Sequence, residues 1–302
     1  MALYTNDAGV LKELKEMPFK LERDLQKVFE SSLSTIMGLE LVKSEFTIKN
    51  KRIDTLAYDP QTLAFIIIEY KRDKSMSVVD QGFTYLSLML ENKAEFIIEY
   101  NESLKKDMRR SDIDWSQTRV AFVSPSFTEN QIQATNFKDI GIELWEVKQF
   151  ENNTLIINPI KKSSSAESIK PLTKGKELLQ KLTEEIKVYT ENDHIENGTD
   201  LTKELYEKFK TAIFNLADSI EVVPLKFWLN FDKGSITLAS IEIQKKKLNL
   251  TINKKAGLLS DPKNISRDVS NIGHYGKGDY QIQVEDDANL EYIMSLVKQV
   301  IR

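Results

Sequence analysis

The chain contains no cysteine among its 302 residues. It therefore cannot form a disulfide, a thiolate metal site or a cysteine nucleophile. Histidine is nearly as scarce, because His194 and His274 are its only two copies, and this excludes a histidine-rich zinc site. A chain free of cysteine fits a reducing compartment, and we expect a cytoplasmic protein.

Long apolar runs are also missing. No stretch approaches the ~20 apolar residues of a membrane-spanning helix, and residues 1–21 mix charged with apolar residues, unlike a signal peptide. We therefore expect no membrane association. An excess of basic residues is missing too, since the formal net charge is −4. Any nucleic-acid partner would have to be bound by local basic patches.

What remains is the composition of ordinary folded domains, with 41% hydrophobic and 29% charged residues. Strand and helix patterns alternate over residues 1–160, which predicts a mixed α/β sheet with helices on both faces. A serine-rich polar run predicts a linker over residues 161–173. In residues 174–302 helical patterns precede strand patterns, which predicts a smaller α+β domain with an antiparallel sheet.

Hydrophobic periodicity and turn residues place the individual elements. In the first domain we expect helices at about 18–37, 76–92, 102–110 and 128–138, and strands at 39–46, 50–58, 65–72, 95–100, 119–123, 142–147 and 154–159. In the second we expect helices at about 174–191, 200–218 and 287–301, and strands at 225–231, 236–243, 248–252 and 280–284.

The strand at Phe65–Arg72 ends in an unusual way. Four apolar residues give it the character of a buried central strand, yet it closes with Glu69, Tyr70 and Lys71. Glu69 and Lys71 are two residues apart and share one face. Charges at the end of a buried strand are costly if left unpaired. An ion pair between the two is the purely structural explanation, and a functional site is the alternative.

Asp54 favours the functional site. It lies in the preceding strand, and pairing through the intervening turn can bring it beside Glu69. Two adjacent carboxylates repel unless a proton or a cation lies between them. Carboxylates and a backbone carbonyl, here that of Tyr70, are ligands that Mg²⁺ prefers, with Mn²⁺ as an alternative. Lys71 can orient a water and neutralise charge on a phosphate. The pattern predicts a metal-dependent phosphodiesterase site with Asp54, Glu69 and Lys71 as catalytic residues.

Asp54 followed by Glu69-Tyr70-Lys71 resembles the (P)D…(D/E)xK motif of the PD-(D/E)XK nuclease superfamily, with Ile53 in place of the proline. The segment around these residues is similar to the nuclease domain of NucS-type endonucleases over roughly residues 15–150. The resemblance implies a restriction-endonuclease-like fold and metal-dependent cleavage of DNA.

The same resemblance implies further roles. Glu22 lies in a helix that often supplies an additional acidic metal ligand in this superfamily. Glu30 competes for that role. The ordinary alternative for Glu22 is an exposed contact with a side chain one turn away on the same helix. Gln81 and Tyr85 resemble the Gln-x-x-x-Tyr signature of the RecB-like branch and would support the site or touch the substrate. Tyr85 equally suits the core. Apart from the resemblance, Arg52 belongs with Lys49 and Lys51 to a basic cluster that suits a solvated hairpin, with contact to phosphate near the metal end as the alternative.

The second domain gives weaker signals. The loop Gly273–Gly278 lacks the Walker spacing, so a tight turn is expected, with His274 in a structural role. The basic strand Lys245–Lys255 suits a solvated sheet face, with nucleic-acid contact as the alternative. Leu259–Pro262 and Ile272–Asp279 resemble a domain of unknown function found at the ends of predicted nucleases and some modification-dependent restriction proteins. That resemblance implies recognition or interaction.

We therefore expect a Mg²⁺-dependent endonuclease that acts on DNA, in antiviral defence by restriction or in repair. One rival hypothesis keeps the nuclease fold as a catalytically silent nucleic-acid-binding module. Metal-independent binding that is insensitive to Asp54→Ala would favour that rival. In another, residues 174–302 serve only to form a homodimer.

Overall fold

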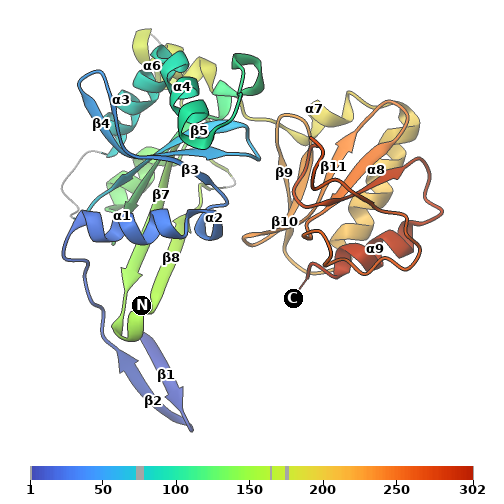
Figure 1. The fold of residues 1–302 in the computed structure, drawn as a ribbon, viewed down its shortest axis with the longest axis horizontal. Helices are drawn as coiled ribbons and strands as arrows, with labels where there is room; N and C mark the ends of the chain where they lie inside the picture. The colour runs from blue at the N-terminus through green and yellow to red at the C-terminus, as the bar shows by residue number, and fades with distance from the viewer. Residues whose placement is uncertain (1, 73–77, 164, 174–176, 302) are drawn as a thin grey trace. The chain divides into compact units, whose positions relative to one another are not determined.

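The computed structural model describes residues 2–72, 78–163, 165–173 and 177–301. The expected helix starts at Met76 and at residue 174 lie outside the described residues. The chain divides into two compact units, residues 1–188 (unit 1) and residues 189–302 (unit 2) (Figure 1). No helix among the described residues is long and apolar enough to cross a lipid bilayer.

Unit 1 is built on a mixed sheet of six strands in the order β3-β4-β5-β6-β7-β8. The strands are β3 (Glu40–Ile48), β4 (Lys51–Asp59), β5 (Ala64–Tyr70), β6 (Arg119–Ser124), β7 (Ile142–Gln149) and β8 (Leu155–Ile160). β5 pairs in parallel with β6, and β6 with β7, whereas the remaining pairs are antiparallel. Every residue of β5 is buried, as the apolar run predicted for a central strand.

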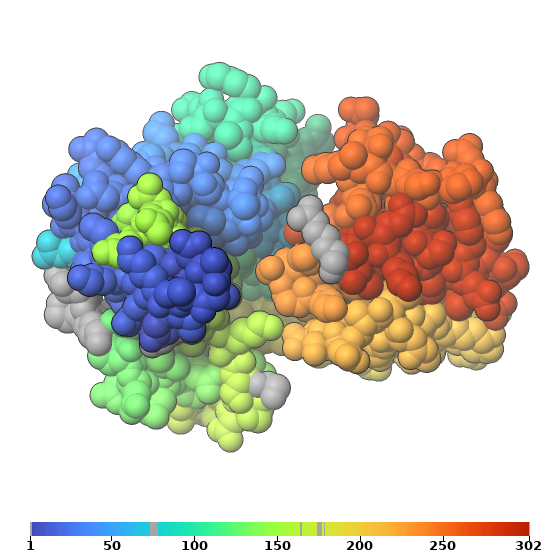
Figure 2. All heavy atoms as spheres, turned by 90° about the horizontal axis from the view of Figure 1, so that it is seen from below, coloured from blue at the N-terminus to red at the C-terminus, as the bar shows by residue number. Residues whose placement is uncertain are grey.

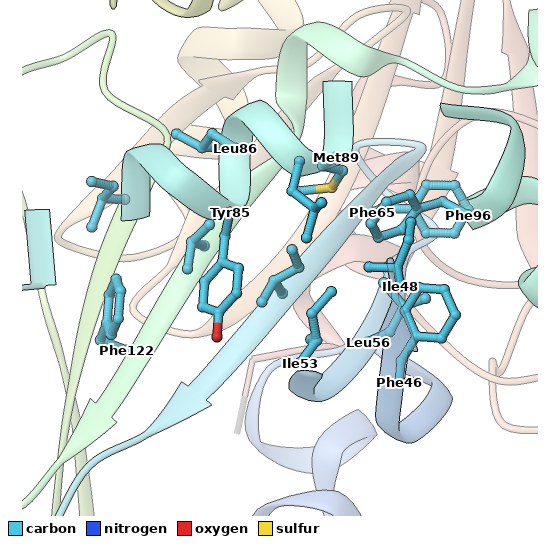
Figure 3. Packing of buried hydrophobic residues seen from close by; sticks show 14 of the residues in the cluster. Phe46, Ile48, Ile53, Leu56, Phe65, Tyr85, Leu86, Met89, Phe96 and Phe122 are labelled. Carbon is cyan, nitrogen blue, oxygen red and sulfur yellow. The ribbon is translucent and has the colours of Figure 1, made fainter. Parts of the chain in front are cut away.

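Helices cover both faces of this sheet, which confirms the predicted α/β class. They are α1 (Glu22–Ser31), α2 (Leu33–Ile36), α3 (Val78–Glu91), α4 (Lys93–Leu104), α5 (Glu129–Thr135) and α6 (Glu177–Glu185), with short 3₁₀ turns at Arg110–Asp112, Trp115–Gln117, Glu151–Asn153 and Lys170–Thr173. α1 packs Leu25 and Phe29 onto one face. On the other face α3 and α4 pack Tyr85, Leu86 and Phe96 against β4 and β5 (Figure 3).

The strand expected at 95–100 and the helix expected at 102–110 are wrong, because α4 spans Lys93–Leu104. The short apolar run there suits either element by itself. Phe96 and Tyr100, four residues apart, are buried while Ile98 is 50% exposed, which is the helical pattern. The parallel pairing of β5 with β6 also requires a long crossover, and α3 and α4 supply it.

A hairpin precedes the expected first helix. β1 (Leu3–Asp7) pairs antiparallel with β2 (Val10–Leu14), and the sequence patterns predicted no element in this segment. The hairpin forms a dark-blue exposed surface beside the yellow-green atoms of β7 and β8 (Figure 2). It is attached to the sheet by a bridge between Glu16 and Phe150.

Unit 2 has an antiparallel sheet of six strands in the order β13-β14-β12-β11-β10-β9. Its elements are α7 (Glu191–Ile195), α8 (Asp200–Phe214), β9 (Ile220–Pro224), β10 (Leu229–Lys233), β11 (Ile236–Ile243), β12 (Leu248–Ile252), β13 (Arg267–Asp268), β14 (Tyr280–Val284) and α9 (Leu290–Lys298). α8 and α9 cover one face of the sheet and enclose the core with it. The predicted α+β class with an antiparallel sheet is confirmed.

One strand of unit 2 was misplaced. The segment expected as a strand at 225–231 is a turn between β9 and β10 over its first half, closed by a hydrogen bond from Leu225 N to Trp228 O of 2.9 Å. Pro224 ends β9 and favours this turn, because proline cannot donate to a sheet ladder.

The units divide after Val188, beyond the linker expected at 161–173. α6 belongs to unit 1: Leu182 lies in its core cluster, and Ile169, within the expected linker, packs against the same cluster. Lys93 of α4 also pairs with Glu185 of α6 at 2.6 Å. The serine-rich composition concealed these apolar anchors.

Candidate active site

Asp54 and Glu69 meet where β4 and β5 end. The strand register pairs Thr55 with Ile68, and one step further places Asp54 opposite Glu69. The Glu69 carboxylate lies on the face covered by α3, where it contacts Gln81, and the Asp54 carboxylate reaches the backbone of β5 near the end of the strand. Asp54 Oδ2 accepts a hydrogen bond of 3.1 Å from Tyr70 N. Burial, together with the nearby charge of Glu69, raises the pKa of Asp54 to about 6.

The Glu69 carboxylate is satisfied on one side only. The residue is 5% exposed, and its Oε1 accepts hydrogen bonds from Lys71 Nζ at 2.7 Å and from Gln81 Nε2 at 2.8 Å. Its Oε2 is buried and has no hydrogen-bond partner among the described residues. An unsatisfied carboxylate oxygen in this position is costly for the fold, so a donor or a cation directed at it would be stabilising.

Gln81 and Tyr85 project from α3 toward this carboxylate. Gln81 Nε2 lies 3.3 Å from the Tyr85 hydroxyl, which in turn donates to the carbonyl of Arg52 at 3.3 Å. The Tyr85 ring packs in the core while its hydroxyl points away from the helix (Figure 3). Both expected roles of Tyr85 are therefore combined in one side chain. Burial and the charge of Glu69 raise the pKa of this phenol above its ordinary range.

The side chain of Tyr70 lies on the opposite face of β5. Its ring makes an edge contact with Phe29 of α1 at 5.9 Å between centroids, and its hydroxyl lies 3.3 Å from Thr55 Oγ1. Tyr70 therefore contributes only its backbone near Asp54 and Glu69.

Glu22 and Glu30 stand apart from the two carboxylates. Glu22 Oε1 accepts a hydrogen bond of 2.8 Å from Arg72 N, directly after β5, whereas Glu30 Oε1 accepts from Thr55 Oγ1 at 2.5 Å. Glu30 is thereby held beside Thr55 and Tyr70. Within the described part of the chain, no group of three histidine or acidic side chains is arranged to hold a metal ion.

Gln26 is a site residue that the sequence patterns did not reveal. It is 6% exposed, and its Nε2 contacts Asp54 O at 2.9 Å, Glu30 Oε1 at 3.0 Å and Ser44 Oγ at 3.2 Å. It thereby ties the backbone of Asp54 to α1. The available signal was a polar residue next to Leu25 on the apolar stripe of the helix.

Glu45 is a second missed residue. Its backbone has a φ of +56°, which turns it out of the β3 ladder, and its charge adds to the rise in the pKa of Asp54. Its carboxylate forms an ion pair with Arg52 Nε. The Arg52 side chain is thus exposed and paired with Glu45, while its carbonyl supports Tyr85.

An open groove of about 490 Å³ runs between α1 and the β3–β4 hairpin. It is lined by Arg23, Gln26, Lys27, Glu30, Ser44, Glu45 and Arg52. Three of these side chains are cationic. Because Gln26 lines the groove and also binds the backbone carbonyl of Asp54, the groove reaches the backbone of β4 at Asp54.

The donor set fits a hard divalent cation. Asp54, the unpartnered Oε2 of Glu69 and a backbone carbonyl at Tyr70 offer only oxygen atoms, and Mg²⁺ retains several waters when a protein supplies few ligands. Lys71 beside them can neutralise an anionic substrate.

Comparisons with known proteins give one full-length relative. An uncharacterized protein of Haemophilus influenzae is 52% identical over 302 residues, which covers 100% of both chains. Residues 191–299 match the model of a domain of unknown function, DUF5655, which confirms the expected C-terminal domain of unknown function.

Three solved structures are similar to part of the chain. They are a repair endonuclease from Pyrococcus abyssi (18% identity, 44% of this chain and 49% of that chain, TM-score 0.25), the complex of EndoMS with double-stranded DNA (13%, 44% and 47%, 0.26) and Pyrococcus furiosus SfsA in complex with Ca²⁺ (15%, 52% and 68%, 0.24). This chain spans about half the length of the two endonucleases. Similarity at these TM-scores carries no functional argument, so the function has to be argued from the site.

Proposed function

This chain belongs to the same family as the uncharacterized Haemophilus influenzae protein, and we propose that its unit 1 is a Mg²⁺-dependent nuclease that hydrolyses phosphodiester bonds in DNA. The observation that carries the proposal is the buried, half-satisfied Glu69 carboxylate opposite Asp54 and bonded to Lys71. A structural ion pair accounts for Glu69 and Lys71 alone. It leaves unexplained the second carboxylate and the buried oxygen without a partner.

The geometry supports a proposed role for each of these residues. Asp54, Glu69 Oε2 and the Tyr70 carbonyl would hold the cation, and Glu22 remains a proposed accessory ligand near the end of β5. The cation, when bound, polarises the phosphate and activates water. Lys71 orients the attacking water and neutralises charge that develops on the phosphate.

Gln81 and Gln26 position the two carboxylates. Gln81 holds Glu69 Oε1, so that Oε2 is the oxygen that would bind the cation, and the Tyr85 hydroxyl restrains Gln81. Gln26 fixes the Asp54 backbone from the opposite side of the sheet. Carboxylates held in this way need little reorganisation when the substrate binds.

Cleavage assays with the full chain test the proposal. We expect nicking or cutting of supercoiled, linear, single-stranded or branched DNA with Mg²⁺ or Mn²⁺, and none in excess EDTA. Glu69→Gln should abolish cleavage, because an amide binds a divalent cation poorly, whereas Glu99→Gln on α4 should leave it intact. Absence of cleavage for every substrate, or full activity of Glu69→Gln, would contradict the proposal. Binding of these substrates without cleavage of any of them would favour a silent binding module.

The basic groove offers a path for the substrate backbone. Arg23 and Lys27 lie one helical turn apart on α1, are exposed and line the groove beside Asp54. We expect Arg23→Ala with Lys27→Ala to weaken DNA binding several-fold at low salt and to reduce the slope of log K against log salt by about 2, or about 0.9 for each lost phosphate contact. Anisotropy titrations of the full chain in EDTA measure both.

The matched control for the groove is Lys12→Ala with Lys15→Ala, in and just after the exposed β2 strand. If this control pair changes the salt slope as much as the groove pair does, the DNA path proposed for the groove is wrong.

A further inference from the structure

Unit 2 has an aromatic cluster outside its core. The rings of Phe227 and Tyr275 stack with centroids 4.6 Å apart and planes 20° apart, and Trp228 stacks with Tyr275 at 5.5 Å and 23°. Tyr275 is 41% exposed. Lys226 Nζ lies 5.1 Å from the centre of the Phe227 ring. Stacked, partly exposed rings with an adjacent ammonium are not needed by the core, which α8 and α9 cover on the other face of the sheet.

The glycine-rich loop at 273–278 presents this cluster. Lys277 N donates to Ser240 Oγ at 3.2 Å, and Thr251 Oγ1 donates to the carbonyl of Tyr275 at 3.1 Å. Gly276 has a φ of +104°, and a Cβ there would lie 2.9 Å from the Cβ atoms of Ser240 and Thr251. The loop therefore lies flat on the sheet, and glycine is required for that. Its purpose is to place Tyr275 against Trp228, which a simple turn into β14 would not need.

A polar row of the sheet adjoins the part that the loop covers. The strand register pairs Glu242 with Asn249 and Asn249 with Gln283. The β10–β11 register pairs Leu229 with Ile241, and one step further places Trp228 opposite Glu242. Glu242 Oε2 accepts a hydrogen bond of 2.7 Å from Asn249 Nδ2. Asn249 is 8% exposed, and its Oδ1 has no hydrogen-bond partner among the described residues. A buried acceptor in this state is costly, and a ligand that donates a hydrogen bond would relieve it.

Positive charge borders the same row. Lys245, Lys246 and Lys247 form the turn between Glu242 and Asn249, and Lys226 and Lys277 flank the stacked rings. In contrast, acidic residues gather in and around the helices, at Glu191, Asp193, Glu196, Asp200, Glu204, Glu207, Glu285, Asp286, Asp287 and Glu291. The lysines around the stacked rings and the polar row are complementary to an anionic ligand with a flat ring.

We propose that the aromatic and polar surface around Tyr275, Trp228 and Asn249 binds an unpaired nucleobase in a single strand of nucleic acid. The base stacks on the exposed ring surface of Tyr275 and Phe227, and Asn249 Oδ1 accepts a hydrogen bond from its exocyclic amino group. The surrounding lysines contact the phosphates. Aromatic platforms with basic surroundings are the general mode of binding to single strands. This binding requires no cation and is independent of the cleavage proposed for unit 1.

The test uses the full chain in EDTA and fluorescence anisotropy of a labelled single-stranded deoxyoligonucleotide. Tyr275→Ala should weaken binding about tenfold or more, because stacking dominates such affinities. Tyr275→Phe keeps the ring and should bind like the wild type, which separates loss of stacking from loss of folding. Tyr4→Ala removes another exposed tyrosine, from the β1 strand, and serves as the control. Equal affinities of wild type and Tyr275→Ala overturn the proposal, as does equal binding of an abasic oligonucleotide.

Two further sets of titrations define the ligand. Asn249→Ala should erase a preference for cytosine over thymine oligonucleotides, and absence of any such preference in the wild type overturns the role of Asn249. Parallel titrations with RNA establish which sugar the site accepts, and tight binding to either single strand supports it, whereas stronger binding to fully paired duplex overturns it. The wild type should bind single strands in EDTA, where the cleavage proposed for unit 1 does not occur. A protein that binds single strands but cleaves no DNA would therefore contradict only the nuclease proposal for unit 1.

Discussion

Replacement of Lys71 by methionine is expected to lower DNA cleavage by about 10²–10⁴-fold, the usual effect of removing one positioned electrostatic or proton-transfer group. Only 11% of the Lys71 side chain is exposed, and its Nζ lies 2.7 Å from Glu69 Oε1. Methionine keeps the length and apolar stem of lysine but cannot orient a water or neutralise phosphate. Asp54 and Glu69 remain available to the cation, so the lost rate should appear in kcat more than in metal affinity.

The control is Lys43→Met, which removes a half-exposed lysine that pairs with Glu99 at 2.9 Å on the surface of β3 and α4. Its cleavage rate should stay within about twofold of the wild type, because exposed ion pairs contribute little to stability. Circular dichroism and thermal melts check the fold of both variants. If Lys71→Met retains wild-type cleavage, Lys71 is the partner in a structural ion pair and the proposed mechanism fails.

The pairing of Asp54 with Glu69 was accessible from sequence because it depends on two simple regularities. Strand alternation places Glu69 and Lys71 on one face, and a tight turn between adjacent strands brings Asp54 to the same end. Gln81 was named through the resemblance to the Gln-x-x-x-Tyr signature, and the four-residue spacing then placed Gln81 and Tyr85 on one side of the helix. In each case the geometry is local, or crosses a single hairpin.

Residues that depend on distant packing escaped prediction. Gln26 reaches Asp54 only because α1 lies against β4, and Glu45 approaches the site because β3 leaves its ladder at a left-handed residue. Neither α1 docking nor a bulge is encoded in the periodicity of one segment. Phe96 and Tyr100 show the same limit, since their apolar run suits a strand until the crossover between parallel strands demands a helix. The loop that displays Tyr275 required knowledge of Ser240 and Thr251 beneath it.

Asp54→Asn should abolish cleavage and, in the absence of metal, make the protein more stable at neutral pH. Burial and Glu69 raise the pKa of Asp54 from its ordinary 3.8 to about 6. The folded state thus binds the Asp54 proton more tightly than the unfolded state does. The ionised carboxylate therefore costs stability, and that cost grows as the pH rises from about 4 to about 6 and persists above it. Asparagine carries no charge and still accepts the hydrogen bond from Tyr70 N.

Denaturant unfolding in EDTA measures this effect. The free energy of unfolding of Asp54→Asn should exceed that of the wild type by about 1–3 kcal/mol at pH 8. The two free energies should converge near pH 4, where Asp54 is largely protonated in the folded wild type. Excess Mg²⁺ should then stabilise the wild type, because a ligand of the folded state shifts the unfolding equilibrium, and should stabilise the variant far less. The control Asp24→Asn removes a carboxylate from α1, away from the pair. It should change neither the stability at pH 8 nor the stabilisation by Mg²⁺. A variant that loses cleavage but shows no pH-dependent gain in stability would mean that Asp54 is not strained by Glu69. The carboxylate pair would then not be a site held ready for a cation, and the central argument for the nuclease would fail with it.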